Sequence, residues 1–399
     1  GFTSDLEKED TLWYKSNPTL VYNVTDSNMD KIEVSVNGKT VVNTISKDGK
    51  YSITPDTEDG QVTVAVVATD KMGHVVTDTF KYMKDSTAPG NVEAITDANG
   101  VYKDGKMFFK KATSVRVSAE DNGAGVDKYI LSGSKSEENE TGLFKLGTGE
   151  YNVSVSDKLG NETNNYSIAD LLNWDSNDVV VDGDAPTISI DVPTPQVDKW
   201  YNKNVGYTFS LKDNVGIGHV SIKINGTELV AETTETWNDT AKQFYVSTGD
   251  VPQSDNGMYQ VSVEVEDNAC NKSTWSDTVY VDKTAPTVDR FEFTGNGSVE
   301  GSEKNGSNRY GFFFDGEASC TIHVSDGTVS SGLDKVHVVL ESTSGSKTEH
   351  DISVKDGVAR VSIPANFKGF ISAHAVDRVG NVGSVSKPDG VITETGNWH

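Results

Sequence analysis

The chain has 399 residues, of which 60 are Asp or Glu and 35 are Lys or Arg, so its net charge is −25. This charge argues against nucleic acid as a partner and against electrostatic binding to anionic membranes. It suits a soluble surface or a chain that binds cations. The two cysteines are too few for a disulfide framework, and we expect both thiols to stay unpaired. No signal peptide, transmembrane run or lipidation motif is recognisable, so Gly1 is expected to begin a fragment of a longer protein.

Three short motifs recur along the chain in a fixed order. A turn that begins with Asp, D-N-x-G in its clearest form, comes first, then D-x-x-G-N, then D-x-T-A-P. The first lies at 26–31, 121–126, 213–217 and 326–333; the second at 70–74, 157–161, 267–271 and 377–381; the third at 85–89, 182–186 and 282–286. An interval of roughly 90–110 residues predicts four copies of one small domain. A motif that recurs once per domain favours an architectural role over a single reaction centre.

Alternating apolar residues predict half-buried strands in every repeat. They run into the D-x-x-G-N turns at 62–66, 153–155, 261–265 and, less regularly, 370–375. A further strand follows each turn, so each pair is predicted to form a hairpin. An aromatic doublet opens a strand earlier in each repeat, with strand B after it, at 13–14, 108–109, 200–201 and 312–314. Asn37-Gly38 and Asn225-Gly226 are predicted to close hairpins through positive φ angles, and only 167–174 is expected to make a helical turn.

Short strands with turns at this spacing predict an all-β fold of tandem immunoglobulin-like antiparallel β-sandwiches. The boundaries are placed at the D-x-T-A-P elements, where Pro removes a backbone donor and stiffens the chain. The predicted domains are 1–84, 85–181, 182–281 and 282–399. Because the linkers contain no Gly/Ser tract, we expect an elongated, semi-rigid rod.

The ordered motif set resembles the tandem bacterial immunoglobulin-like (Big-type) repeats of large cell-surface and exported adhesin-like proteins. The resemblance covers nearly the whole chain. Departures from the pattern are His74 for Asn, Cys270 for Gly, the Gly183-Asp184 version of the linker, and the spread turn from Asp326 to Leu333. The resemblance implies export to the bacterial surface or secretion, and a role as a spacer or ligand-binding stalk.

In this fold each linker enters a domain at the end that carries the two Asp turns, so the carboxylates of all three motifs should meet there. Ca²⁺ takes six to eight oxygen ligands and would relieve the repulsion. The resemblance makes interdomain Ca²⁺ plausible, since related adhesin repeats hold it. Turn chemistry alone is the alternative, because tight turns prefer Asp, Asn and Gly. The candidate ligands are Asp85 with Asp121 and Asp157; Asp182 or Asp184 with Asp213 and Asp267; and Asp282 with Asp326 and Asp377.

Aromatic residues outside the repeated positions are the candidate ligand-binding residues. They are Trp174, Trp237 and Trp275, each with a hydrophobic cap as the alternative role. The doublets are expected to pack in the cores. The seven histidines show no zinc-site spacing, and no nucleophile elbow, Walker A or dinucleotide fingerprint occurs. The chain is therefore predicted not to be an enzyme.

Three functions remain open at the level of the sequence. The first is an adhesion module on the bacterial surface, or a secreted one, that binds a host protein or a glycan; immunoglobulins are one conceivable protein target. The second is a passive stalk that spaces another functional domain from the cell. The third is an accessory region of a secreted carbohydrate-active enzyme. We expect a monomer without direct membrane insertion.

Overall fold

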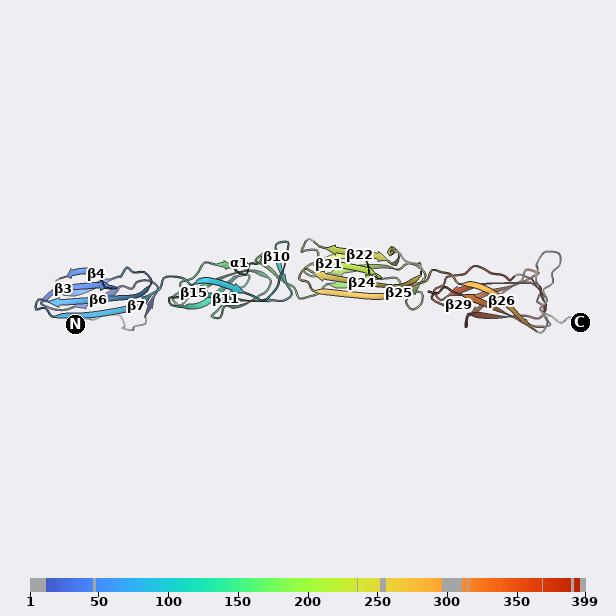
Figure 1. Cartoon of the computed structure of the whole chain (residues 1–399), viewed down its shortest axis with the longest axis horizontal. Coiled ribbons are helices and arrows are strands. Elements are labelled where there is room, and N and C mark those ends of the chain that lie inside the picture. Colours follow the sequence, from blue (N-terminus) through green and yellow to red (C-terminus); the bar gives the residue numbers. More distant parts are fainter. Residues whose placement is uncertain are drawn as a thin grey trace. The chain divides into compact units, whose positions relative to one another are not determined.

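The computed structural model describes residues 12–45, 48–234, 236–251, 256–295, 311–313, 316–367, 369–388 and 391–394. The chain divides into two compact units. Unit 1 comprises Gly1–Asp184 with Asn268–Cys270, and unit 2 comprises Ala185–Asp267 with Asn271–His399. Each unit carries two β-sandwiches, numbered 1 to 4 along the chain (Figure 1).

Sandwich 1 pairs its strands in two sheets. The larger sheet has the order β1-β7-β6-β3-β4, and β2 pairs with β5 in the other. The strands are β1 (Trp13–Tyr14), β2 (Leu20–Val24), β3 (Met29–Val36), β4 (Lys39–Ile45), β5 (Gly49–Ile53), β6 (Gly60–Asp70) and β7 (Val75–Lys84). Asn37 and Gly38, with φ of 46° and 79°, form the tight turn between β3 and β4. The positive φ angles explain why Asn and Gly occupy these positions.

Sandwich 2 has one sheet of order β13-β12-β15-β17-β10-β9, with β16 paired to β15, and a second of order β14-β11-β8. Its elements are β8 (Gly90–Ile95), β9 (Val101–Lys103), β10 (Lys106–Phe109), β11 (Thr113–Glu120), β12 (Val126–Gly133), β13 (Glu137–Asn139), β14 (Leu143–Leu146), β15 (Gly149–Asp157), β16 (Tyr166–Ser167), α1 (Ile168–Leu172) and β17 (Asp178–Val181). The predicted helical turn is confirmed as α1, whose first turn is capped by the Ser167 side chain.

Sandwich 3 has sheets of order β19-β25-β24-β21-β22 and β18-β20-β23. Its elements are β18 (Thr187–Asp191), β19 (Trp200–Tyr201), β20 (Gly206–Lys212), β21 (Ile217–Ile224), β22 (Thr227–Thr233), β23 (Ala241–Ser247), the short 3₁₀ turn η1 (Thr248–Asp250), β24 (Gly257–Asp267) and β25 (Lys272–Val281). The predicted hairpin across the D-x-x-G-N turn is confirmed as the β24–β25 pair.

Sandwich 4 repeats this plan with sheets of order β27-β33-β32-β29-β30 and β26-β28-β31. Its strands are β26 (Thr287–Gly295), β27 (Gly311–Phe313), β28 (Ala318–Ser325), β29 (Leu333–Ser342), β30 (Lys347–Ser353), β31 (Val358–Ile363), β32 (Gly369–Asp377) and β33 (Val391–Glu394). Figure 1 labels β26 and β29, which belong to its two different sheets.

Each aromatic doublet lies in a short strand ahead of strand B, as expected. Each forms a short strand of its own that pairs in parallel with the last strand of its sandwich: β1 with β7, β10 with β17, β19 with β25 and β27 with β33. This pairing joins residues about 70 to 80 positions apart, so local sequence patterns could not reveal it.

Each sandwich has its own hydrophobic core. The clusters of buried side chains lie within residues 20–82, 107–179, 201–281 and 293–375. They are built from inward-facing alternate residues such as Ile32 and Val34, both 0 % exposed. The all-β fold of tandem immunoglobulin-like sandwiches is thus confirmed, while the boundaries before 85, 182 and 282 stay predictions. Cys270 and Cys320 are both free thiols, as expected. Within the described ranges, no helix is long and apolar enough to span a bilayer.

Candidate metal clusters at the linkers

The backbone of the aromatic doublet in sandwiches 1, 2 and 3 holds the linker aspartate that follows the sandwich. The Asp85 N–H donates to the Tyr14 carbonyl over 3.0 Å, and the Asp282 N–H donates to the Tyr201 carbonyl over 2.8 Å. Asp182 makes the same bond to Phe109 over 2.8 Å. The doublets of sandwiches 1 to 3 therefore fix the backbone position of the linker aspartates, in addition to packing in the cores.

The first carboxylate cluster joins the linker after sandwich 1 to two turns of sandwich 2. Carboxylate oxygens of Asp85, Asp121 and Asp157 lie within 4.8 Å of one another. Asp85 and Asp157 are only 2 % and 1 % exposed. Among the described residues, no lysine or arginine forms an ion pair with any of the three. Three acidic groups thus meet in a poorly hydrated place without a protein cation beside them.

Backbone donors orient these carboxylates from outside the cluster. Asp85 Oδ2 accepts from the Ala124 N–H over 2.7 Å, and Asp121 Oδ1 accepts from the Gly123 N–H over 2.6 Å. Asp157 Oδ1 accepts from the Asn161 N–H over 2.7 Å and so closes its own turn. The remaining oxygen of Asp121, Oδ2, is fully buried and accepts no hydrogen bond from any described residue. A buried carboxylate oxygen in that state normally requires a partner.

The second cluster repeats this geometry at the linker after sandwich 3. Carboxylate oxygens of Asp282, Asp326 and Asp377 lie within 4.8 Å of one another. Asp282 Oδ2 accepts from the Ser331 N–H over 2.7 Å, as Asp85 accepts from Ala124. Asp326 Oδ2 is buried and accepts no hydrogen bond from the part of the chain that the structure describes. The two clusters are therefore equivalent sites built by the same motifs.

The electrostatics of the second cluster favour proton or cation binding. Burial raises the pKa of Asp326, and the neighbouring charge of Asp282 raises it further. Burial also raises the pKa of Asp377, with smaller contributions from Asp282 and Asp326. Bringing these groups together as carboxylates costs free energy that a divalent cation would recover.

The third predicted group contains residues of both units. Within unit 2, carboxylate oxygens of Asp213 and Asp267 lie within 4.8 Å of each other. Asp182 belongs to unit 1 and is 2 % exposed. Asp184 is exposed, and its N–H donates to Asp182 Oδ1 over 3.2 Å. Of the two alternatives for this linker, Asp182 is therefore the buried one. A metal site of these four residues stays a prediction.

In two of the D-x-x-G-N turns the asparagine ties the turn to the linker, a role that the sequence analysis did not predict. Asn161 Nδ2 donates to the Asp85 carbonyl over 3.0 Å and to Asp157 Oδ2 over 2.6 Å. Asn381 Nδ2 donates to the Asp282 carbonyl over 2.8 Å and to Asp377 Oδ2 over 2.7 Å. The recurrence of Asn at the last motif position was the signal that could have indicated this contact, but the preference of tight turns for Asn also explains it.

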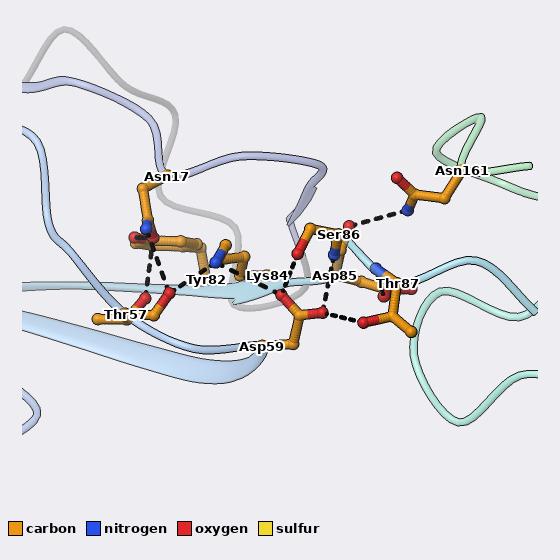
Figure 2. Close-up of polar contacts among 9 residues, drawn as sticks. All are labelled: Asn17, Thr57, Asp59, Tyr82, Lys84, Asp85, Ser86, Thr87 and Asn161. Carbon is orange, nitrogen blue, oxygen red and sulfur yellow. Dashed lines mark hydrogen bonds and ion pairs between the residues drawn. The ribbon is translucent and has the colours of Figure 1, made fainter.

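The preceding sandwich holds the linker from the other side (Figure 2). Asp59 accepts from the Ser86 N–H over 3.0 Å, from the Ser86 hydroxyl over 2.8 Å and from the Thr87 hydroxyl over 2.6 Å. These bonds, led by that of Thr87, lower the pKa of Asp59 to about 2. Asn256 has the same role at the next such linker, where its Nδ2 donates to Asp282 Oδ1 over 3.0 Å. Asp59 directly precedes Gly60, where β6 begins, and Asn256 directly precedes Gly257, where β24 begins.

Two of the three tryptophan candidates pack against a hydrophobic core. Trp174 contacts Phe109, with ring centroids 4.9 Å apart and the rings tilted by 45°, and packs against the core of sandwich 2. Trp275 lies edge-on to Phe209 at 5.7 Å and packs against the core of sandwich 3. Trp237 is half-buried in the turn between β22 and β23. Trp174 and Trp275 thus contribute to packing, and ligand binding by any of the three stays a prediction.

Comparison with known proteins agrees with this architecture. Residues 3–86 match the family model for the bacterial Ig-like domain. The Ig-like domains that follow repeat its sheet order and its motifs. No curated protein matches the chain.

The chain is also similar to several solved structures. One is the tetra-tandem repeat in the extending region of a large adhesion protein, 16% identical, with 98% of each chain covered and a TM-score of 0.33. Another comes from a 1.5-MDa bacterial ice-binding adhesin, 16% identical, covering 77% of this chain and 99% of that one, with a TM-score of 0.30. The eight N-terminal Ig domains of the Down Syndrome Cell Adhesion Molecule are 13% identical, with all of this chain and 49% of that one covered and a TM-score of 0.40. These likenesses concern the Ig-like fold alone.

Proposed function

We propose that this chain is an extracellular segment of a bacterial surface protein, acting as a stalk whose linkers are stiffened by Ca²⁺. The support is that the main contacts of the linker after sandwich 1 recur in equivalent form at the linker after sandwich 3. A doublet carbonyl and a clasping side chain hold the linker from the preceding sandwich, and an asparagine holds it from the next. A spacer needs repeated, stiff junctions. The proposal gives the chain a mechanical role and no catalytic one.

The single observation that carries the calcium part is the buried, unpartnered oxygen in each cluster. Asp121 Oδ2 and Asp326 Oδ2 are both enclosed by other carboxylates and accept no hydrogen bond among the described residues. An all-oxygen set of carboxylates is the donor set that hard cations such as Ca²⁺ prefer. Asp85, Asp121 and Asp157 would hold one ion, and Asp282, Asp326 and Asp377 another. The remaining ligands would be carbonyl oxygens or water.

An ion that binds the linker and sandwich 2 at the same time would restrict motion at the linker. Asp85 belongs to the linker after sandwich 1, whereas Asp121 and Asp157 belong to sandwich 2. An ion bound by all three would stabilise the joined arrangement by mass action. The gain in free energy would be about 2.7 kcal/mol at a Ca²⁺ concentration one hundred times the dissociation constant.

The test compares the whole chain in Ca²⁺ and in chelator. Ca²⁺ should raise the melting temperature and lengthen the particle measured by small-angle X-ray scattering. Asp121→Asn and Asp326→Asn should each weaken both responses, because Asn keeps the shape of Asp but removes its charge. The matched controls are Asp104→Asn and Asp356→Asn, which change exposed turn residues of the same sandwiches. Equal responses from cluster and control variants, or no response in the wild type, would overturn the proposal.

Adhesion is a second candidate, with a host protein or a glycan as partner. It is motivated by Trp237, a half-buried aromatic residue in a turn, outside the buried core cluster of sandwich 3. Half-buried tryptophans in turns are frequent binding anchors. A glycan array and a host-protein pull-down with the whole chain separate this candidate from the stalk. The role of accessory region in a carbohydrate-active enzyme stays a prediction.

A further inference from the structure

Sandwich 3 carries an exposed tyrosine that lies along the outer face of its smaller sheet. Tyr245 on β23 is 69 % exposed, whereas its neighbours Phe244 and Val246 pack into the core, so its side chain belongs to the outer face. A Cβ added at Gly206 on β20 would lie 2.4 Å from the Tyr245 hydroxyl oxygen and 2.8 Å from Cε2. The ring therefore lies across β20, in the space that this glycine leaves, and its other side is open to solvent.

Polar side chains continue this face beside the ring. Thr208 on β20 is in register with Tyr245 on one side and with Asp191 on β18 on the other, so the three form one row across the sheet. The next row consists of Ser189, Ser210 and Gln243. The side chains of Asp191 and Thr208 form no hydrogen bond or ion pair with any residue that the structure describes. Their carboxylate and hydroxyl groups are thus available to a ligand.

The charge and composition of this face favour an uncharged ligand. Its three strands place one acid and one base on the outer side, Asp191 and Lys212, whereas the whole chain has a net charge of −25. An anionic ligand would be repelled by the chain, and an uncharged one would not. The centre of a protein interface normally combines several aromatic or aliphatic side chains. Here a single aromatic ring is surrounded by hydroxyl and amide groups.

We propose that this face binds an uncharged glycan, with the Tyr245 ring as the stacking surface and with Asp191 and Thr208 as hydrogen-bond partners. The C–H groups on one side of a sugar ring are weakly positive and pack against the negative face of an aromatic ring. Sugar hydroxyls can donate to the carboxylate and exchange hydrogen bonds with the Thr208 hydroxyl. Asp191 and Tyr245 are two strand spacings apart, about 9–10 Å, so the row fits linked sugars better than a single one.

The test is affinity electrophoresis of the whole chain in gels that contain dextran, galactomannan, xyloglucan or starch, with heparin and polyglutamate as anionic polymers. At least one uncharged polysaccharide should retard the wild type, and the anionic polymers should not. Tyr245→Ala should weaken this binding by about tenfold or more, as the loss of an aromatic anchor usually does. Tyr245→Phe should retain most of it, because stacking requires the ring. Asp191→Ala should weaken it by about tenfold, since hydrogen bonds to a charged group are lost.

Tyr102→Ala is the matched control, because it removes another exposed tyrosine, on β9 of sandwich 2. It should be retarded as the wild type is, and circular dichroism checks that every variant is folded. Gly206→Ala keeps the Tyr245 ring but should displace it, and so should weaken binding. Retardation should be equal in Ca²⁺ and in chelator, so this proposal can fail or hold independently of calcium at the linkers. No retardation by any uncharged polysaccharide, retardation by the anionic polymers alone, or equal retardation of Tyr245→Ala and the wild type would overturn it.

Discussion

Single polar side chains at the linkers carry several hydrogen bonds each, and they do so in equivalent positions of different sandwiches. Asn161 bonds both a linker carbonyl and a carboxylate of its own turn, and Asn381 repeats both bonds. Asp59 and Asn256 hold the linker from the preceding sandwich. Charge-assisted hydrogen bonds of this kind are among the stronger ones in proteins. The stability of each linker should therefore depend on very few residues.

Asp59 provides a test by pH. Its pKa is about 2 in the folded chain, against 3.8 for the ordinary carboxyl group. A lowered pKa means that the stabilisation is complete above 3.8 and is lost as the pH falls from 3.8 to about 2. Asp59→Asn should reduce the free energy of unfolding at neutral pH, and the difference from the wild type should shrink over that window. Urea unfolding at a series of pH values measures it. A difference that is constant with pH would contradict this assignment.

At the scale of elements, the turns shape the clusters as much as the carboxylates do. The turn between β11 and β12 brings the Gly123 backbone so close to the linker that a Cβ there would lie 2.1 Å from Asp85 Oδ2. Gly123 has no positive φ angle, so this contact and not backbone strain explains the glycine. Gly123 stands at the third position of this turn because the Asp85 carboxylate occupies the space that a side chain would need.

Replacing Gly123 by alanine should push the Asp85 carboxylate out of the cluster. We expect Gly123→Ala to destabilise the chain by about 1–3 kcal/mol, because the buried carboxylate would lose its bond to the Ala124 N–H. It should also weaken any stabilisation by Ca²⁺. The control is Gly90→Ala, at a glycine with no heavy atom within 4 Å of the added Cβ. Denaturant midpoints measure both variants, and equal effects would refute the steric explanation.

At the scale of the whole molecule, stability should depend on the balance between acidic repulsion and bound cations. The chain carries 60 acidic and 35 basic residues, so its carboxylates repel one another at neutral pH. The Asp282, Asp326 and Asp377 cluster concentrates that repulsion, because burial raises the pKa of two of its members. An ion at this place would change both local and overall stability.

The pH dependence of unfolding in chelator tests this balance. The folded state holds the protons of Asp326 and Asp377 more tightly than the unfolded state does. The free energy of unfolding should therefore fall as the pH rises from 3.8 through the raised pKa values. Excess Ca²⁺ should cancel this loss, and below pH 3.8 it should have little effect, since protonated carboxyls bind metal poorly.

The same experiment on Asp326→Asn isolates this cluster from the other carboxylates of the chain. The difference in unfolding free energy between wild type and variant should fall with rising pH in chelator. In Ca²⁺ it should favour the wild type at neutral pH. A difference that rises with pH in chelator would contradict the raised pKa of Asp326.

Local chemistry in the sequence was enough to predict the repeated fold and much of the candidate site. Alternating residues such as Val62, Val64 and Val66 must face one side of a strand, and Asn37-Gly38 tolerates the positive φ angles of a tight turn. The fold then implied that Asp85 would approach Asp121 and Asp157. These features follow from neighbours in the chain or from the known geometry of one sandwich.

Only the tertiary structure decided which distant residues touch. It placed the aromatic doublets in short parallel strands, turned Trp174 and Trp275 toward the cores, and set Asn161 against the Asp85 carbonyl. It also laid Tyr245 over Gly206 and in one row with Thr208. Strand register and side-chain packing join residues that are far apart in sequence. Many such pairings are compatible with one pattern of alternating residues, and the packed core selects among them.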